Sequence, residues 1–175
     1  MVNTNRTRDI LGQVYEMAGA VPTPARRKDM INLGYIALLL MGTENGIELA
    51  ETYRDEFTRK IENHEHGIPG EKVRLLWYQN RIQFENPLEK ILEDEFRAAV
   101  VVDELNDINW DPIDPDNPYE GLAQRILRNP LVGHVSNRIE HLIHLMEKYR
   151  LDGLINPCHW GCRQGTGPRG LVTKE

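Results

Sequence analysis

The stretch that decides the fold is residues 71–105, EKVRLLWYQNRIQFENPLEKILEDEFRAAVVVDEL. Residues 73–78 and 98–102 are short apolar runs with the length and composition of buried strands. Between them, Pro87 precedes a segment, residues 88–96, whose apolar side chains recur at helical spacing. A strand, a helix and a second strand in this order are typical of a βαβ unit with parallel strands.

The rest of the chain extends this pattern in both directions. Downstream, helices are predicted around residues 119–127 and 139–149, and a third strand at Leu154-Ile155. Upstream, apolar residues at helical spacing predict three helices, which end in the polar segment 63–70. The sequence thus predicts an α/β protein with an N-terminal helical region, residues 1–70, and a Rossmann-like lobe with a parallel sheet, residues 71–175.

Composition excludes several classes of protein. Of the 175 residues, 40% are hydrophobic and 27% charged, which is typical of a globular domain. The net charge of −6 disfavours a nucleic-acid partner, which would require a basic surface. The longest apolar run, residues 36–41, is too short to span a membrane, and the first residues do not resemble a signal peptide. We therefore expect a cytoplasmic protein with no membrane partner.

The segment after the third predicted strand contains the most reactive side chains. Ligands of an open parallel sheet bind beyond the carboxyl ends of its strands, where residues 79–86, 103–118 and 156–170 are expected to meet. Both cysteines of the chain, Cys158 and Cys162, lie in the last of these segments. Two thiols are too few for a closed zinc site or a cubane cluster, so a partial ligand set, a redox dithiol and two incidental cysteines all stay open.

The same segment is rich in glycine, and the middle segment is rich in acid. Gly161, Gly165, Gly167 and Gly170 are expected to leave backbone amides accessible to a ligand. The acidic residues between 103 and 120 are better explained by turns and solvation than by a cation site, because prolines interrupt them and the spacing matches no calcium loop.

Four segments together resemble a known family: GEKVRLLWYQNRIQF, AAVVVDEL, NPYEGLAQRILRNP and EKYRLDGLINPCHWGCRQ. In order and spacing they are similar to the D-component family of 2-hydroxyglutaryl-CoA dehydratases and benzoyl-CoA reductases, over about residues 44–175. The resemblance implies an iron–sulfur subunit with a [4Fe-4S] cluster on three cysteines, a paralogous partner subunit and an ATP-dependent activator protein. The implied reaction is the elimination of water from a (R)-2-hydroxyacyl-CoA by a ketyl radical, or the reduction of an aromatic ring in the reductases.

The resemblance also implies roles for individual residues. Cys162, ten positions after Asp152, matches the middle family cysteine better than Cys158 does, although both are candidate metal ligands. The candidate substrate-binding residues, expected to line the pocket for the acyl-CoA substrate or the cluster, are Trp77, Phe84, His159, Trp160 and Arg163.

The chain departs from the family in its cysteines. None precedes Cys158, and the chain stops where the helix after the third strand is expected. We expect either a fragment of a longer subunit or a paralogue without a cluster that serves as a partner-binding module. In either case the isolated chain is expected to lack catalytic competence and to bind at most a fraction of a cluster.

Overall fold

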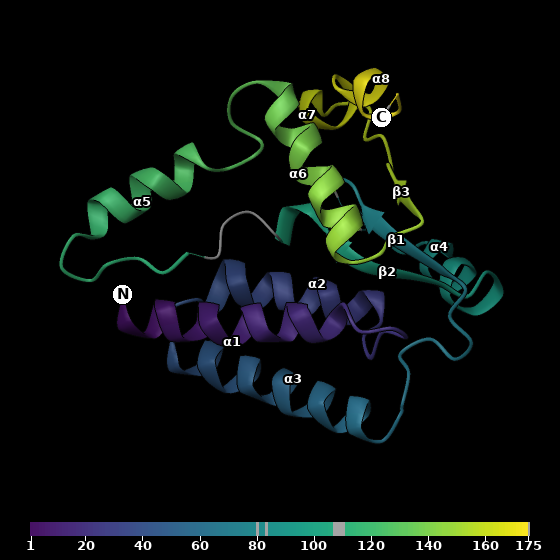
Figure 1. Cartoon of the computed structure of the whole chain (residues 1–175), viewed down its shortest axis with the longest axis horizontal. Helices are drawn as coiled ribbons and strands as arrows, with labels where there is room; N and C mark the ends of the chain where they lie inside the picture. Colours follow the sequence, from purple (N-terminus) through teal and green to yellow (C-terminus); the bar gives the residue numbers. More distant parts are fainter. Residues whose placement is uncertain (80, 83, 107–110, 175) are drawn as a thin grey trace.

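The structure is a computed structural model that describes residues 1–79, 81–82, 84–106 and 111–174. Three layers are visible in Figure 1: helix α6, a small sheet, and a group of N-terminal helices. Within the described residues, no helix has both the length and the apolar character needed to cross a membrane.

The N-terminal layer consists of α1 (Val2–Ala18), α2 (Arg27–Tyr35) and α3 (Glu44–Glu62). A π-helical segment, η1 (Ile36–Leu40), prolongs α2. The apolar residues that predicted these helices form one buried cluster, with Leu11, Val14, Met30, Leu33, Ala50 and Phe57 at its centre. The three helices are therefore held together by their apolar faces.

The sheet has three strands, β1 (Val73–Trp77), β2 (Ala98–Asp103) and β3 (Gly153–Ile155), in the order β2-β1-β3. Both pairs of neighbours are parallel, and the register between β1 and β2 shifts between Leu75 and Leu76. Every residue of β2 is buried, as its run of small and β-branched side chains predicts. This parallel sheet among helices confirms the predicted α/β class.

Helical segments connect the strands and follow the last one. They are α4 (Leu88–Lys90) with the π-helical η2 (Ile91–Glu95) between β1 and β2, the 3₁₀ turn η3 (Glu104–Asn106), α5 (Pro118–Leu127) and α6 (Val135–Lys148) between β2 and β3, and α7 (Arg163–Thr166) and α8 (Arg169–Val172) after β3. The crossovers carry the chain back to the starting edge of the sheet, as parallel strands require.

Helices cover both faces of the sheet. On one face, Leu76 and Tyr78 pack in a buried cluster with Leu142 of α6. On the other face, the Arg27 guanidinium of α2 lies 3.5 Å from the ring centroid of Trp77. Successive residues of β1 thus face opposite layers, which is the alternation of an extended strand.

Arg74 ties the helical layer to the sheet at the amino end of β1. Its guanidinium donates to the carbonyl oxygens of Gly19 (3.0 Å), Ala20 (3.1 Å) and Tyr149 (3.2 Å), and it pairs with Glu71 at 2.5 Å. These carbonyls lie at the ends of α1 and α6, where backbone acceptors lack helical partners. The division of the chain into two regions at residue 70 stays a prediction. Arg74 joins these two regions through its hydrogen bonds to Gly19, Ala20 and Tyr149.

Candidate functional site

A pocket of about 520 Å³ opens at the carboxyl edge of the sheet. Four separate parts of the chain line it, and the lining residues are Tyr35, Leu38, Arg81, Ile82, Phe84, Leu105, Pro157 and His159. Apolar walls with few polar groups are typical of small-molecule sites, and this edge is where open parallel sheets bind their ligands. The lining residues that the structure describes include no acid.

Arg81 is fixed in the wall of this pocket by Asp103, the last residue of β2, and by Asn106 of η3. Its Nε donates to Asp103 Oδ2 at 3.1 Å, and its Nη2 donates to Asn106 Oδ1. Asn106 is itself anchored, because its amide donates to the carbonyl of Met30 in α2 at 2.9 Å. A Cβ at Gly34 would overlap the Arg81 guanidinium and Asn106 Oδ1, so a glycine here makes room for this network.

The charge of the pair is partly buried. Burial raises the pKa of the Asp103 carboxyl above its ordinary value, although the Arg81 and Arg27 guanidinium groups act in the opposite direction. The Asp103 side chain is fully buried, while the Arg81 side chain is 13% exposed. Arg81 therefore presents a cation at the pocket wall, and Asp103 and Asn106 hold that cation in place.

A second buried ion pair supports the ends of β1 and β2. Arg138 of α6 donates from Nε and Nη2 to the two carboxylate oxygens of Glu104, at 2.5 and 2.7 Å. Glu104 also accepts the backbone N–H of Gln79 at 3.0 Å, and the third guanidinium nitrogen, Nη1, donates to the carbonyl of Gln164 at 2.5 Å. This pair thus joins both strand ends, α6 and α7.

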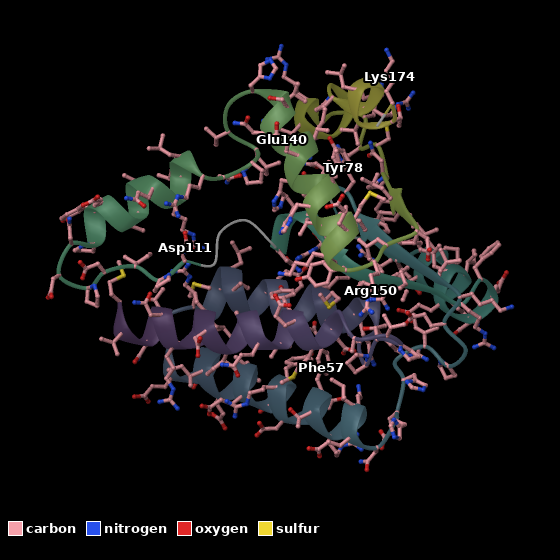
Figure 2. All side chains as sticks on the ribbon, viewed as in Figure 1. Phe57, Tyr78, Asp111, Glu140, Arg150 and Lys174 are labelled. Atoms are coloured by element: carbon pink, nitrogen blue, oxygen red, sulfur yellow. The ribbon has the colours of Figure 1, made fainter. Side chains whose placement is uncertain are left out.

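Tyr78 completes that support. The Arg138 guanidinium lies 4.2 Å from the centroid of the Tyr78 ring, on the side of β1 that α6 covers (Figure 2). Burial raises the pKa of the Tyr78 phenol to about 12, because the buried environment disfavours the phenolate.

Both cysteines are free and half-buried, but their thiols have different neighbours. Cys162 Sγ lies 3.6 Å from Gln79 Oε1, and Cys158 Sγ lies 3.6 Å from Nη1 of Arg169. The backbone N–H of Cys162 donates to the carbonyl of His159 at 2.9 Å, so residues 159–162 form a tight turn.

The glycines of this segment differ from the expectation. The N–H of Gly165 donates to the carbonyl of Cys162 and that of Gly167 to the carbonyl of Arg163, so α7 consumes these two amides. Helix formation by the segment after the turn thus removes two of the donors expected to face a ligand.

The predicted substrate-binding residues do not all come together. Phe84 and His159 line the pocket, and 73% of Phe84 is exposed. Trp77 is only 1% exposed beneath Arg27 and lies outside the lining. Trp160 and Arg163 are exposed on the turn beside His159 and at the start of α7, and they lie outside the lining as well.

The residues present do not fit a complete iron–sulfur cluster. Among the described parts of the chain, no group of three or more His, Cys, Asp or Glu side chains is placed to hold a metal ion. A cubane requires more thiolates than Cys158 and Cys162 supply. A cluster at this position would therefore need donors beyond those described in this chain.

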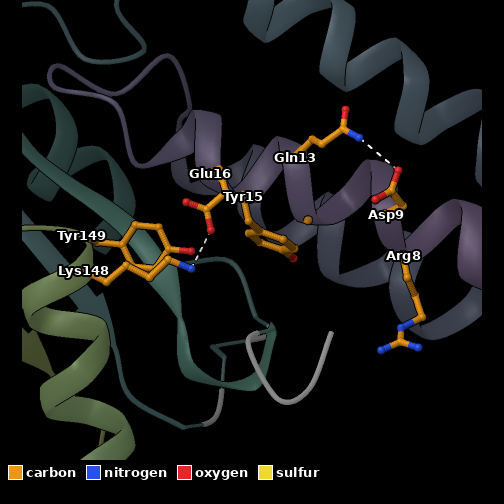
Figure 3. Close-up of a pocket in the computed structure, with 8 residues that line it drawn as sticks. Arg8, Asp9, Gln13, Tyr15, Glu16, Lys148 and Tyr149 are labelled. Atoms are coloured by element: carbon orange, nitrogen blue, oxygen red, sulfur yellow. Dashed lines mark hydrogen bonds and ion pairs between the residues drawn. The ribbon is translucent and has the colours of Figure 1, made fainter. Parts of the chain in front are cut away.

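A smaller pocket, of about 300 Å³, lies between α1 and the end of α6 (Figure 3). Lys148 Nζ spans it to Glu16 Oε1 at 2.6 Å, and the Lys148 ammonium lies 4.9 Å from the ring centroid of Tyr149. Because α6 ends just before β3 begins, this pocket is at the amino edge of the sheet, away from the carboxyl-edge pocket.

Sequence reasoning missed several residues that build the carboxyl-edge pocket. Tyr35 and Leu38 come from the N-terminal region. No motif in the sequence indicates that this region contacts the carboxyl edge of the sheet. Arg81, Glu104 and Arg138 were not identified either. The signal that buried cationic partners were needed is a pair of adjacent acids at the end of a fully buried strand, Asp103 as its last residue and Glu104 directly after it.

Comparison with known proteins agrees with the resemblance of the four segments. The sequence matches the family model described as 2-hydroxyglutaryl-CoA dehydratase, D-component, over residues 1–175. No curated protein sequence and no solved structure matches the chain. The match extends the resemblance from residue 44 to the first residue. The chain therefore belongs to the 2-hydroxyglutaryl-CoA dehydratase D-component family.

Proposed function

We propose that this chain is a component of a 2-hydroxyacyl-CoA dehydratase-type enzyme and that its carboxyl-edge pocket binds the acyl-CoA substrate. The observation that carries the proposal is the pocket of about 520 Å³, which combines apolar walls with the held cation of Arg81 at the expected edge of the sheet. Family membership supports a dehydratase-type component. The reaction we propose for the enzyme is the elimination of water from a (R)-2-hydroxyacyl-CoA after one-electron activation by an ATP-dependent activator.

The chemistry of the pocket wall suits a thioester. Leu38, Leu105 and Phe84 offer apolar surface to an acyl chain and to the pantetheine arm. Arg81 places a positive charge where a carbonyl oxygen gains electron density, and Asp103 holds that guanidinium in position. The proposed role of these residues is to bind and orient the thioester, and none of them requires a cofactor for that role.

The cluster is proposed only as a shared site. Cys162 and Cys158 would supply thiolate ligands, and the remaining donors would come from outside the described residues, for example from a paralogous subunit. Because the described donor set is incomplete, catalysis is proposed for the assembled cytoplasmic enzyme, with its partner subunit and activator, and not for this chain alone.

Binding of the substrate to the chain tests the pocket. Isothermal titration with a (R)-2-hydroxyacyl-CoA is expected to give saturable binding, which Arg81→Met weakens by roughly tenfold or more, the cost of a charge-assisted contact. Gly34→Ala is expected to weaken binding as well, because the added Cβ displaces Arg81 without removing its charge.

The matched control is Arg59→Ala on α3, which removes one exposed cation that pairs only with Glu65 among the ion pairs described. Equal affinity of the native chain and the Arg81→Met variant would contradict the proposed pocket. Tighter binding of benzoyl-CoA than of the hydroxyacyl ester would instead favour a benzoyl-CoA reductase-type subunit.

A second candidate is a partner-binding module without a cluster, favoured by the incomplete donor set. Replacing both cysteines with serine distinguishes the two functions. A binding module keeps its affinity for the paralogous subunit and supports the same activity of the complex. A cluster subunit loses iron and activity in the complex.

A further inference from the structure

We propose that Trp160, Arg163 and Arg169 form a subsite for the phosphorylated adenosine end of coenzyme A, beside the mouth of the carboxyl-edge pocket. This inference rests on the proposed function and adds to it a part of the ligand that lies outside the pocket. The pocket can hold an acyl group and the pantetheine arm, but a nucleotide with three phosphate groups requires an aromatic surface and cations.

The first observation is the position of Trp160. The hydrogen bond from Cys162 N–H to the His159 carbonyl closes the turn, and Trp160 occupies its tip with 96% of its surface exposed. His159, the preceding residue, lines the pocket. A large aromatic ring with almost no protein contact, directly beside a pocket, is a surface that a planar base can cover by stacking.

The second observation is the charge of the segment that surrounds this turn. Residues 153–174 contain Arg163, Arg169 and Lys174 but no Asp or Glu, in a chain whose net charge is −6. Such a local excess of cations in an acidic protein attracts a polyanion to this surface. CoA, with its diphosphate and its 3′-phosphate, is such a polyanion.

The third observation is how close the two arginines come to the lining residues, Arg169 in space and Arg163 along the chain. Nη1 of Arg169 lies 3.6 Å from Cys158 Sγ, and Cys158 stands between the lining residues Pro157 and His159 in the chain. Arg163 follows directly on the turn and begins α7, with its side chain exposed. Within the described residues, neither guanidinium takes part in an ion pair, so both charges stay available for phosphate.

The experiment compares three ligands of decreasing length on the full chain. Isothermal titration is expected to rank CoA esters above dephospho-CoA esters, and these above acyl-pantetheine. Trp160→Ala, Arg163→Ala and Arg169→Ala are each expected to weaken binding of the CoA ester by roughly tenfold, the scale of one stacked base or one charged contact. None of the three is expected to change binding of acyl-pantetheine.

Two further variants make the result specific. Trp160→Phe keeps an aromatic face and is expected to restore most of the affinity that Trp160→Ala loses. Arg59→Ala on α3 removes an exposed arginine far along the chain and is expected to leave all three affinities unchanged. Circular dichroism of the variants checks that the fold is retained.

The outcomes separate this inference from the proposed function. If the native chain binds no CoA ester, the proposed function fails, and the subsite with it. If the native chain binds the ester but the Trp160 and arginine variants bind it equally well, the pocket stands and the subsite is wrong. Equal weakening for the CoA ester and for acyl-pantetheine would also overturn the subsite, because those residues would then act on the pocket itself.

Discussion

At the scale of single residues, the site depends on charges that the fold has removed from water. Glu104 and Arg138 are almost completely buried. Each neutralises the charge of the other through two hydrogen bonds. Burying an ion pair costs hydration free energy, which excellent geometry and additional hydrogen bonds offset. Glu104 and Arg138 together fulfil that condition by also binding Gln79 and Gln164. The pair therefore fixes the geometry of the carboxyl edge more than it adds stability.

The Tyr78 phenol leads to a prediction about alkaline pH. Its pKa is raised to about 12 in the folded protein, whereas the ordinary value of 10.0 applies when the chain unfolds. Above pH 10 the unfolded state releases this proton while the folded state retains it, so the free energy of unfolding falls as pH rises from 10 to 12. At pH 11 the loss due to this group is about 1.4 kcal/mol by that linkage.

Urea titrations of the native chain and of Tyr78→Phe at pH 8 and pH 11 measure this loss. The phenylalanine variant cannot ionise at this position and is expected to lose less stability between the two pH values. Tyr119→Phe, on the exposed helix α5, serves as the control that removes a solvated phenol. Identical losses in the native chain and in Tyr78→Phe would contradict the raised pKa.

At the scale of elements, the periodicity of the sequence predicted most of the architecture. The strands expected at residues 73–78, 98–102 and 154–155 coincide closely with β1, β2 and β3. The predicted helices upstream of the sheet and α6 are also present, and their apolar faces are buried. The helix predicted around residues 119–127 is present as α5, although none of its residues is buried. The π-helical segments and the register shift between Leu75 and Leu76 were not predicted, since they arise from packing between distant elements and leave no local signal.

Helix α5 differs from every other long helix, and it leads to a prediction about stability. None of its residues is buried, and Figure 1 shows it apart from the sheet. Ile126 is 63% exposed, so Ile126→Asp is expected to change the free energy of unfolding by less than about 0.5 kcal/mol. Leu142→Ala on α6 is the matched contrast, because Leu142 is buried against the sheet, and it is expected to cost about 2–5 kcal/mol.

Urea denaturation followed by circular dichroism measures both variants. A loss of 2 kcal/mol or more from Ile126→Asp would mean, by the same reasoning on buried apolar groups, that α5 packs against the body of the chain in solution.

At the scale of the whole molecule, the site could be predicted only in its location. The carboxyl edge follows from the order of strands, and Phe84 and His159 line the pocket there, while their role in substrate binding stays a prediction. Trp77 lies in the predicted strand, but the packing of α2 decides which face its ring covers, and it is buried under Arg27. Tyr35 and Leu38 reach the pocket from the N-terminal layer, a long-range contact that no local pattern encodes.

The incomplete donor set leads to the last prediction, which concerns iron. After anaerobic reconstitution with iron and sulfide, the isolated chain is expected to hold substantially less than one [4Fe-4S] cluster per chain, because two thiols with separate neighbours cannot enclose it. Iron analysis and the absorbance of the cluster measure the content. Mixing with the paralogous subunit before reconstitution is expected to raise it, and Cys162→Ser is expected to abolish that rise, while Cys158→Ser reports whether the second thiol also contributes. A full and stable cluster in the isolated chain would contradict the shared site, and equal iron in the complex with and without Cys162 would show that the cysteines of this chain bind none of it.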